Sequence, residues 1–208
     1  MTDLIKNDNS FESEADSDTF YEDDSPLNQK SSKVKDIPKK DFQEIEINNI
    51  INAVSEILTK IIENNNEQPI KNDSIRKKHP SLYSEVSPKI SIYDYVSRIQ
   101  KYCAIEKNTI ILALIYIDRI CEINSLFLTN YNIHKILFTS ILAAIKYNED
   151  SIYSNKYYSE VAGVSLEELN LMEKSFFELI HFKLFADEEE FKKYNFYLEN
   201  YKNVADGM

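Results

Sequence analysis

Ten consecutive residues from Ile136 to Ile145 are apolar or small, and none of them carries a charge. A helix that is apolar on every side is usually buried inside a helical domain. The run is too short for a membrane span, which needs roughly 20 apolar residues. The residues that follow, 146–150, are polar or aromatic. We therefore expect a helix over 130–150 that forms the centre of the fold and ends in a polar segment.

A spacing of three and four between apolar positions predicts an amphipathic helix over 42–64, with its charges mainly on the opposite side. Such a helix must pack on something. We expect it to pack on its own domain, and a self-associating coiled coil is the alternative. The pattern stops after about two heptads, which favours the first. Its apolar positions are Ile47, Ile50, Ile51, Val54, Ile57, Leu58, Ile61 and Ile62.

The same periodicity predicts helices on both sides of the central one. The expected ranges are 92–103, 107–122, 154–161 and 165–184, followed by a short helix from Asp187. Ser91 and Ser165 each precede an acidic residue by three positions, which is the spacing of a capping box at a helix start. Gly163 suits the position just after a helix end. The pattern therefore predicts five consecutive helices, of which the third is central.

Polar segments divide the chain into parts. Residues 1–41 are acidic first and basic later, with little to bury, and we expect them to be disordered. Residues 65–88 contain three prolines and are expected to form a linker, with Leu82, Tyr83 and Val86 as anchors on the domain surface. The main domain is expected at 89–186. A last helix and a tail are expected at 187–208.

Composition narrows the fold and the partners. Only two glycines and five prolines occur in 208 residues, which favours an all-α fold because turns between strands rely on these residues. The net charge of −11 argues against a nucleic-acid partner, since contacts to phosphates need a basic face. No apolar stretch is long enough for a membrane span, so no membrane partner is expected. The abundance of Asn, Ile, Lys and Tyr is typical of an AT-rich genome, such as that of an apicomplexan parasite.

The cysteines and the N-terminus bear on localisation. Cys103 and Cys121 lie in apolar helical patterns, and we expect them to be reduced thiols of a cytoplasmic or nuclear protein. The N-terminus has the character of neither a signal peptide nor a transit peptide. The chain is therefore expected in the cytoplasm, the nucleus or both.

The residue pattern does not favour catalysis, a metal ion or a cofactor. His79, His134 and His181 lie in separate segments without the spacing of metal ligands. Gly163 and Gly207 are too far apart to form a phosphate-binding loop. The acidic runs at 167–168 and 187–190 are expected to be solvated helix starts. We therefore expect a non-catalytic protein.

Five stretches, taken in order, resemble a cyclin box. They are SIYDYVSRIQKYC, LIYIDRI, IHKILFTSILAAIKYNED, SNKYYSEVAGVSLEELNLMEKSFFELIHFKL and EEEFKKY, and together they cover roughly 88–194. More narrowly, the chain resembles the P-type cyclins, a group that includes the U-type cyclins. The helix at 47–62 resembles the extra N-terminal helix of that group. The resemblance implies a bundle of five helices around a buried third helix, plus an N-terminal helix and a short C-terminal helix.

The resemblance also implies a binding site. In cyclins the third and fifth helices contact the C-helix of a cyclin-dependent kinase, through a lysine near the end of the third and a glutamate on the fifth. Carried over, these are Lys146 and Glu173. An ammonium can donate to carbonyl groups and a carboxylate can accept from amide N–H groups. Neighbouring apolar groups are expected to form a socket for an aliphatic side chain of the kinase: Ala143, Tyr147, Phe177, Phe182 and Leu184.

The chain departs from the wider family at one place. It contains no Trp and no MRAIL-like stretch, so the groove that binds Arg-x-Leu motifs in mitotic cyclins is not implied. Asp118 in the stretch YIDRI usually pairs with an arginine of that missing stretch. Arg98 is the candidate substitute, although Asp94, four residues before it, competes for it. A second cyclin repeat is not expected, as in P-type cyclins.

The expected function is that of a regulatory subunit that binds and activates a cyclin-dependent kinase, with a role in cell division. The alternative is a cyclin-fold adaptor that binds a partner without activating a kinase.

Overall fold

The computed structural model describes residues 39–66 and 73–201, and every structural statement here concerns these residues. Residues 1–38 of the tail that is predicted to be disordered lie outside the described part of the chain. The middle of the predicted linker (67–72) and the last residues, 202–208, also lie outside it. The first helix begins at Lys39, slightly before the range expected for it.

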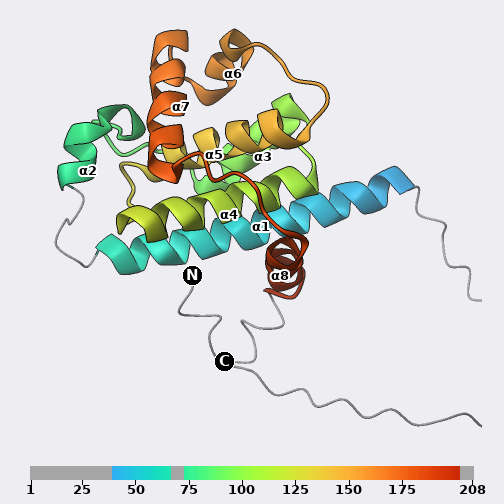
Figure 1. Ribbon diagram of the computed structural model, residues 1–208. Coiled ribbons are helices and arrows are strands. Elements are labelled where there is room, and N and C mark those ends of the chain that lie inside the picture. Colours follow the sequence, from blue (N-terminus) through green and yellow to red (C-terminus); the bar gives the residue numbers. More distant parts are fainter. Residues whose placement is uncertain (1–38, 67–72, 202–208) are drawn as a thin grey trace, which may run out of the picture. The chain divides into compact units, whose positions relative to one another are not determined.

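The described chain consists of helices and connections, with no strand in these ranges (Figure 1). The all-α prediction is confirmed. The elements are α1 (Lys39–Asn66), α2 (Asp73–Lys78), the 3₁₀-helix η2 (Pro80–Leu82), α3 (Ile92–Cys103), α4 (Lys107–Asn124), α5 (Ile133–Asn148), α6 (Asn155–Ala162), α7 (Leu166–Ile180) and α8 (Glu188–Glu199).

The helix at the centre is α5. All ten residues from Ile136 to Ile145 are buried, and α5 packs against α3, α4, α6 and α7. Its two small polar residues are satisfied within the helix, because Thr139 Oγ1 donates to the carbonyl of Lys135 (2.7 Å) and Ser140 Oγ to that of Ile136 (2.8 Å). Hydroxyl groups can therefore be buried here at little cost. The described helices include none that is both long and apolar enough to cross a membrane.

The central position is shared with α4. Every residue from Thr109 to Ile117 is buried, and α4 packs on α1, α5, α7 and α8. Each large aliphatic side chain that is fully buried contributes roughly 1.5–3 kcal/mol relative to exposure. The charged interruption at Asp118-Arg119 coincides with the end of this fully buried stretch.

The N-terminal helix α1 packs on its own domain, along α3, α4 and α8. In Figure 1 it runs lengthwise beside α4. Its apolar face is covered, since Ile50, Ile51, Val54 and Leu58 are all buried. A coiled coil would need these same side chains, so the structure supports packing within the domain.

The segment predicted as a linker contains the two short elements α2 and η2, and η2 packs against α7. Leu82 and Tyr83 are buried, as expected of anchors, whereas Val86 is exposed. Ser81 Oγ donates to the carbonyl of Leu171 on α7 (3.2 Å). Elements of three to six residues are too short to produce a helical hydrophobic pattern, which is why the sequence did not predict them.

The helix ends follow the predicted caps. Ser91 Oγ and Ser165 Oγ accept hydrogen bonds from the backbone N–H groups of Asp94 and Glu168, each at 3.0 Å. At the first box the Asp94 carboxylate accepts from the hydroxyl of Ser91 (2.6 Å), whereas the Glu168 carboxylate pairs with Lys135 (2.7 Å). Gly163 ends α6 in the left-handed conformation, with φ of 77°.

Replacing Gly163 by alanine should lower the free energy of unfolding by about 1–2 kcal/mol, because the left-handed conformation strains any residue with a Cβ. A Cβ at this position would meet nothing within 4 Å, so the measured loss of stability reflects the strain of the backbone and not a steric clash. Urea denaturation checks this. Gly163→Asn is the control and should lose less, since Asn tolerates this conformation better. Equal losses would contradict the explanation.

His79 is buried and His134 is half-buried. His79 is 2 % exposed, and burial, together with the neighbouring Lys78, lowers its pKa, although Glu178 acts in the opposite direction. Burial likewise lowers the pKa of His134, against the effect of a hydrogen bond with the carbonyl of Ile90 (2.9 Å). Both residues therefore favour the neutral imidazole in the folded chain.

Stability should decrease as the pH falls below about 6.5, where unfolded histidine begins to bind a proton and the folded residue does not. Above that pH the stability that the two neutral histidines allow is fully present. It is lost as the pH falls from the pKa of the unfolded chain towards the lower pKa of the folded chain. Urea denaturation between about pH 7.5 and 5.5 measures the slope. The variant His79→Gln should show a shallower slope than the wild type. The control is His181→Gln, at an exposed position. If His79→Gln left the slope unchanged, as the control does, the pH dependence could not be assigned to His79.

Candidate functional site

Lys146 and Glu173 meet on one surface. Lys146 lies in the last turn of α5, directly after the buried stretch, and Glu173 lies midway along α7. Lys146 Nζ is 2.6 Å from Glu173 Oε1, and the two side chains are 29 % and 13 % exposed. The pair is therefore partly shielded from water but still accessible to a partner. The two residues that the resemblance singled out lie side by side.

Asn155, the first residue of α6, is a third member of this polar cluster. Its Oδ1 accepts a hydrogen bond from Lys146 Nζ (2.8 Å), and its Nδ2 donates to Glu173 Oε2 (2.6 Å). The same Nδ2 donates to Oδ1 of Asn170 on α7 (2.9 Å). Sequence reasoning missed Asn155. The signal available was its place directly after the N-cap Ser154, which fixes the start of α6 but says nothing of the direction of the amide.

The cluster keeps hydrogen-bonding capacity. An ammonium has three N–H donors, and Lys146 uses two of them, towards Asn155 and Glu173. Each carboxylate oxygen of Glu173 accepts one bond from this cluster and has a second lone pair. One donor and two acceptor positions are thus left for another molecule.

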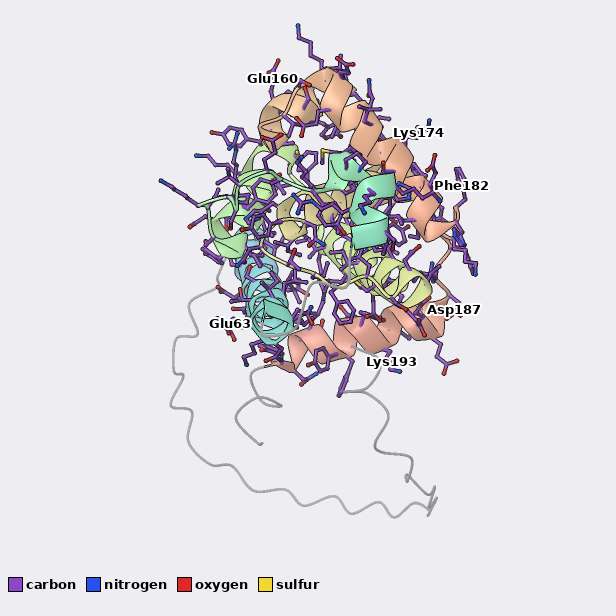
Figure 2. The ribbon with its side chains drawn as sticks, turned by 90° about the vertical axis from the view of Figure 1, so that its left-hand side faces the viewer. Glu63, Glu160, Lys174, Phe182, Asp187 and Lys193 are labelled. Carbon is purple, nitrogen blue, oxygen red and sulfur yellow. The ribbon has the colours of Figure 1, made fainter. Side chains whose placement is uncertain are left out.

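An apolar ledge lies at the C-terminal end of α7, and its first residue, Phe177, follows Glu173 by one helical turn. It consists of Phe177, Phe182, Leu184 and Phe185. Phe182 is 74 % exposed and its ring stacks on that of Phe177, with centroids 5.7 Å apart. Figure 2 shows Phe182 just past the end of α7, at the outer edge of the view. Phe185, which sequence reasoning did not single out, is 73 % exposed. Aromatic side chains exposed to this extent mark a surface that can be covered by a partner.

The ledge depends on an unusual backbone. α7 ends at Ile180, earlier than the expected 184, and the next two residues, His181 and Phe182, are left-handed with φ of 52° and 58°. Left-handed conformations cost residues other than glycine roughly 1–2 kcal/mol each. Strain of this kind is often found at functional sites. It turns the chain back so that Phe182 stacks on Phe177.

Two further predicted contact residues differ from each other. Tyr147 is 49 % exposed next to Lys146, as a surface contact requires. Ala143 is only 2 % exposed, so its methyl group packs inside the bundle and offers no contact surface. One helical turn back from Lys146, α5 is still covered by its neighbours, and for this reason the shared face does not extend to Ala143.

The structure gives Asp118 and Arg98 different partners from the predicted ion pair. Arg98 donates to the carbonyl of Glu160 on α6 (3.3 Å). Asp118 Oδ2 accepts from the hydroxyl of Tyr194 on α8 (2.6 Å), and burial together with this bond raises the pKa of Tyr194. Next to it, Arg119 pairs with Glu190 of α8. The charged interruption of α4 therefore anchors α8.

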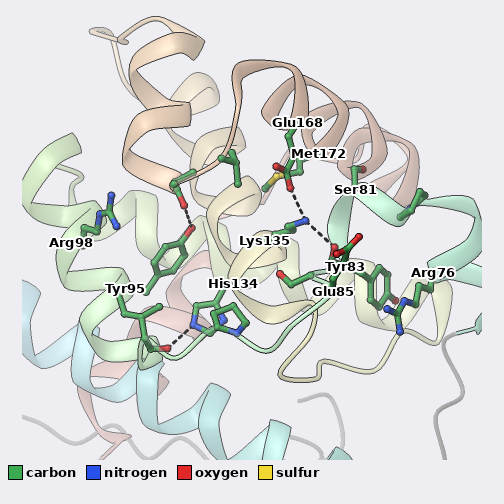
Figure 3. A pocket seen from close by; sticks show the side chains of 17 residues that line it. Arg76, Ser81, Tyr83, Glu85, Tyr95, Arg98, His134, Lys135, Glu168 and Met172 are labelled. Carbon is green, nitrogen blue, oxygen red and sulfur yellow. Dashed lines mark hydrogen bonds and ion pairs between the residues drawn. The ribbon is translucent and has the colours of Figure 1, made fainter.

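A separate pocket of about 940 Å³ lies where α3, α5 and α7 meet the segment around η2 (Figure 3). Lys135 crosses it, pairing with Glu168 and donating to the carbonyl of Tyr83 (2.8 Å). On the other side, Tyr95 donates to the carbonyl of Ala162 (3.4 Å). The segment that the sequence predicted to be a linker thus forms one wall of this pocket. Neither Lys146 nor Glu173 lines it.

Comparison with known proteins identifies the family. A family model described as Cyclin matches residues 48–184, which is more than half of the chain. The chain belongs to the cyclin family, whose members are regulatory subunits. Its relatives place it among the P- and U-type cyclins. The helices α3 to α7 are accordingly the five helices of its cyclin box, with α5 as the third and α7 as the fifth.

Three relatives illustrate the similarity. The chain is 29 % identical over 188 residues to PHO85 cyclin-7 of Saccharomyces cerevisiae, covering 81 % of this chain and 66 % of the relative. It is 32 % identical over 151 residues to Cyclin-U4-3 of Arabidopsis thaliana, covering 72 % of this chain and 67 % of the relative. It is 39 % identical over 109 residues to PHO85 cyclin-like protein psl1 of Schizosaccharomyces pombe, covering 51 % and 45 %.

Proposed function

We propose that this cyclin binds and activates a cyclin-dependent kinase by docking on the C-helix of the kinase. The observation that carries the proposal is the meeting of Lys146 and Glu173 on one surface, one helical turn before Phe177, the first residue of the apolar ledge. A polar cluster next to exposed aromatic rings suits a helix that presents both backbone groups and an apolar side chain.

The polar cluster supplies orientation. The remaining N–H of Lys146 can donate to a backbone carbonyl, and Glu173 can accept from a backbone N–H. Bonds to charged groups are worth about 1.5–3 kcal/mol, more than neutral ones. Lys146 and Glu173 are held before a partner arrives by hydrogen bonds to each other and to Asn155, so less ordering entropy is lost on binding.

The apolar ledge supplies affinity. Phe182 and Phe185 are each more than 70 % exposed, and covering them removes apolar surface from water at about 25 cal/mol per Å². Aromatic residues, phenylalanine among them, are enriched in the buried centres of protein interfaces. An aliphatic side chain of the kinase helix would insert between these rings and Tyr147.

Activation follows from differential binding. In an active kinase the glutamate of the C-helix pairs with the lysine that binds ATP. A cyclin that binds the C-helix only in this inward position shifts the kinase population towards the active state. Moving an equilibrium from 1:99 to 99:1 requires about 5.5 kcal/mol of preference for the active state. The chain itself performs no chemistry, and the role we propose is control of cell division in the cytoplasm or nucleus.

Kinase activity with and without the chain tests the function. The chain is purified with its bound partner, the partner kinase is identified by mass spectrometry, and the recombinant kinase is assayed alone and with the chain. Strong stimulation is expected. Copurification of a kinase without stimulation would instead indicate a cyclin-fold adaptor.

Lys146→Ala combined with Glu173→Ala should abolish kinase binding and stimulation while leaving the thermal unfolding temperature nearly unchanged. The stability effect is small because both partners are removed together, so that no charge is left partly buried without its counter-charge. Calorimetric titration and thermal unfolding are the two measurements. The matched control is Lys192→Ala with Glu188→Ala, which removes an exposed ion pair of 2.6 Å on α8. Full stimulation by the first double variant would show that the binding surface is assigned wrongly.

Phe182→Ala combined with Phe185→Ala should weaken kinase binding by at least tenfold, because the aromatic surface that the kinase covers is lost. The control is Phe196→Ala on α8, a phenylalanine that is 67 % exposed. Calorimetric titration gives the affinities. If the Phe196 variant weakened binding and the ledge variant did not, the apolar contact would lie on α8.

A further inference from the structure

The amide of Asn155 can face only one way in the polar cluster. An ammonium only donates hydrogen bonds and an ionised carboxylate only accepts them. The oxygen of the amide must therefore face Lys146, and its nitrogen must face Glu173. Both N–H groups are used, one towards Glu173 and one towards Asn170. An aspartate of the same shape could accept from Lys146 but would place a second carboxylate next to Glu173.

The backbone that carries Asn155 is fixed by other bonds. Ser154 Oγ caps α6 by accepting from the N–H of Tyr157 (3.4 Å). The hydroxyl of Tyr157 donates to the carbonyl of Tyr102 at the end of α3 (2.7 Å). The N–H of Tyr153, just before the helix, donates to the hydroxyl of Tyr158 (3.1 Å). None of these bonds involves the amide of Asn155, so α6 should keep its place when the amide is removed.

Asn155 determines where the two charged groups point. A lysine side chain has a flexible four-carbon stem, and a single ion pair leaves it many arrangements. With Asn155 present, Lys146 Nζ is held from two sides and both oxygens of Glu173 carry a donor. Groups that are held in the bound geometry before association bind more tightly.

We propose that Asn155 is a positioning residue of the binding site. It holds the Lys146 ammonium and the Glu173 carboxylate in one arrangement, in which both can form hydrogen bonds with backbone groups of the partner. The proposal rests on the proposed function, since the partner it serves is the C-helix of the kinase.

Asn155→Ala and Asn155→Asp test the role in binding, using the recombinant kinase identified by copurification. The alanine variant should weaken binding by about tenfold, the loss expected for a bond to a charged group. The aspartate variant should weaken it further because of repulsion from Glu173. If the side chain served only to fill space, aspartate would be the milder change. That order would overturn the proposal.

Nuclear magnetic resonance of the lysine ammonium groups in the free, full-length chain tests the positioning without a kinase. The order parameter of Lys146 Nζ should fall in Asn155→Ala. It should be unchanged in Asn108→Ala, which makes the same substitution at an exposed position in the first turn of α4. An ordered Lys146 in Asn155→Ala would overturn the proposal, whatever the kinase does. If Lys146 loses order but no kinase binds even the wild type, the proposed function fails and the positioning stands.

Discussion

The burial of α5 is the constraint on which the site depends. Because every residue from Ile136 to Ile145 is covered, the helix can neither rotate nor slide without exposing apolar side chains to water. The backbone of Lys146, the next residue, is therefore held at a fixed direction and depth. The end of α5 is tied further, since Thr109 Oγ1 at the start of α4 donates to Glu149 Oε1 (2.7 Å).

The proposed binding surface is made by segments that are distant in sequence. α5 contributes Lys146, α6 contributes Asn155 and α7 contributes Glu173, and these three side chains share their hydrogen bonds. The packing of α7 on both α5 and α6 makes this possible. Phe177, one helical turn after Glu173, leads from these residues to Phe182, on which it stacks past the end of α7. Packing thus produces a site whose polar and apolar parts have a fixed relation to each other.

The helices could be predicted from the sequence because their signals are local. Apolar periodicity indicated their ranges. The hydroxyl groups of Ser91 and Ser165 cap helix starts, and Gly163 ends a helix because it has no Cβ to oppose a left-handed conformation. The resemblance to cyclins added Lys146 and Glu173, which lie together.

The remaining features depend on packing between helices. Ala143 shares a helical face with Lys146, but whether that face is covered is decided by neighbouring helices. Asn155 bonds to residues 9 and 18 positions away, and Asp118 to a tyrosine 76 positions away. No local spacing reports such contacts. The two left-handed residues after α7 were also missed, because neither is a glycine, the residue that usually indicates this conformation in a sequence.

We propose that one surface, from the end of α5 across α7 to the apolar ledge, binds the kinase. Hydrogen–deuterium exchange of the chain, alone and bound to its kinase, tests this most directly. We predict slower exchange of the backbone amides at 146–150, in the second half of α7 and at 181–186 in the complex. Slower exchange confined to α8, or to the pocket wall at 76–90, with these segments unchanged, would contradict the claim.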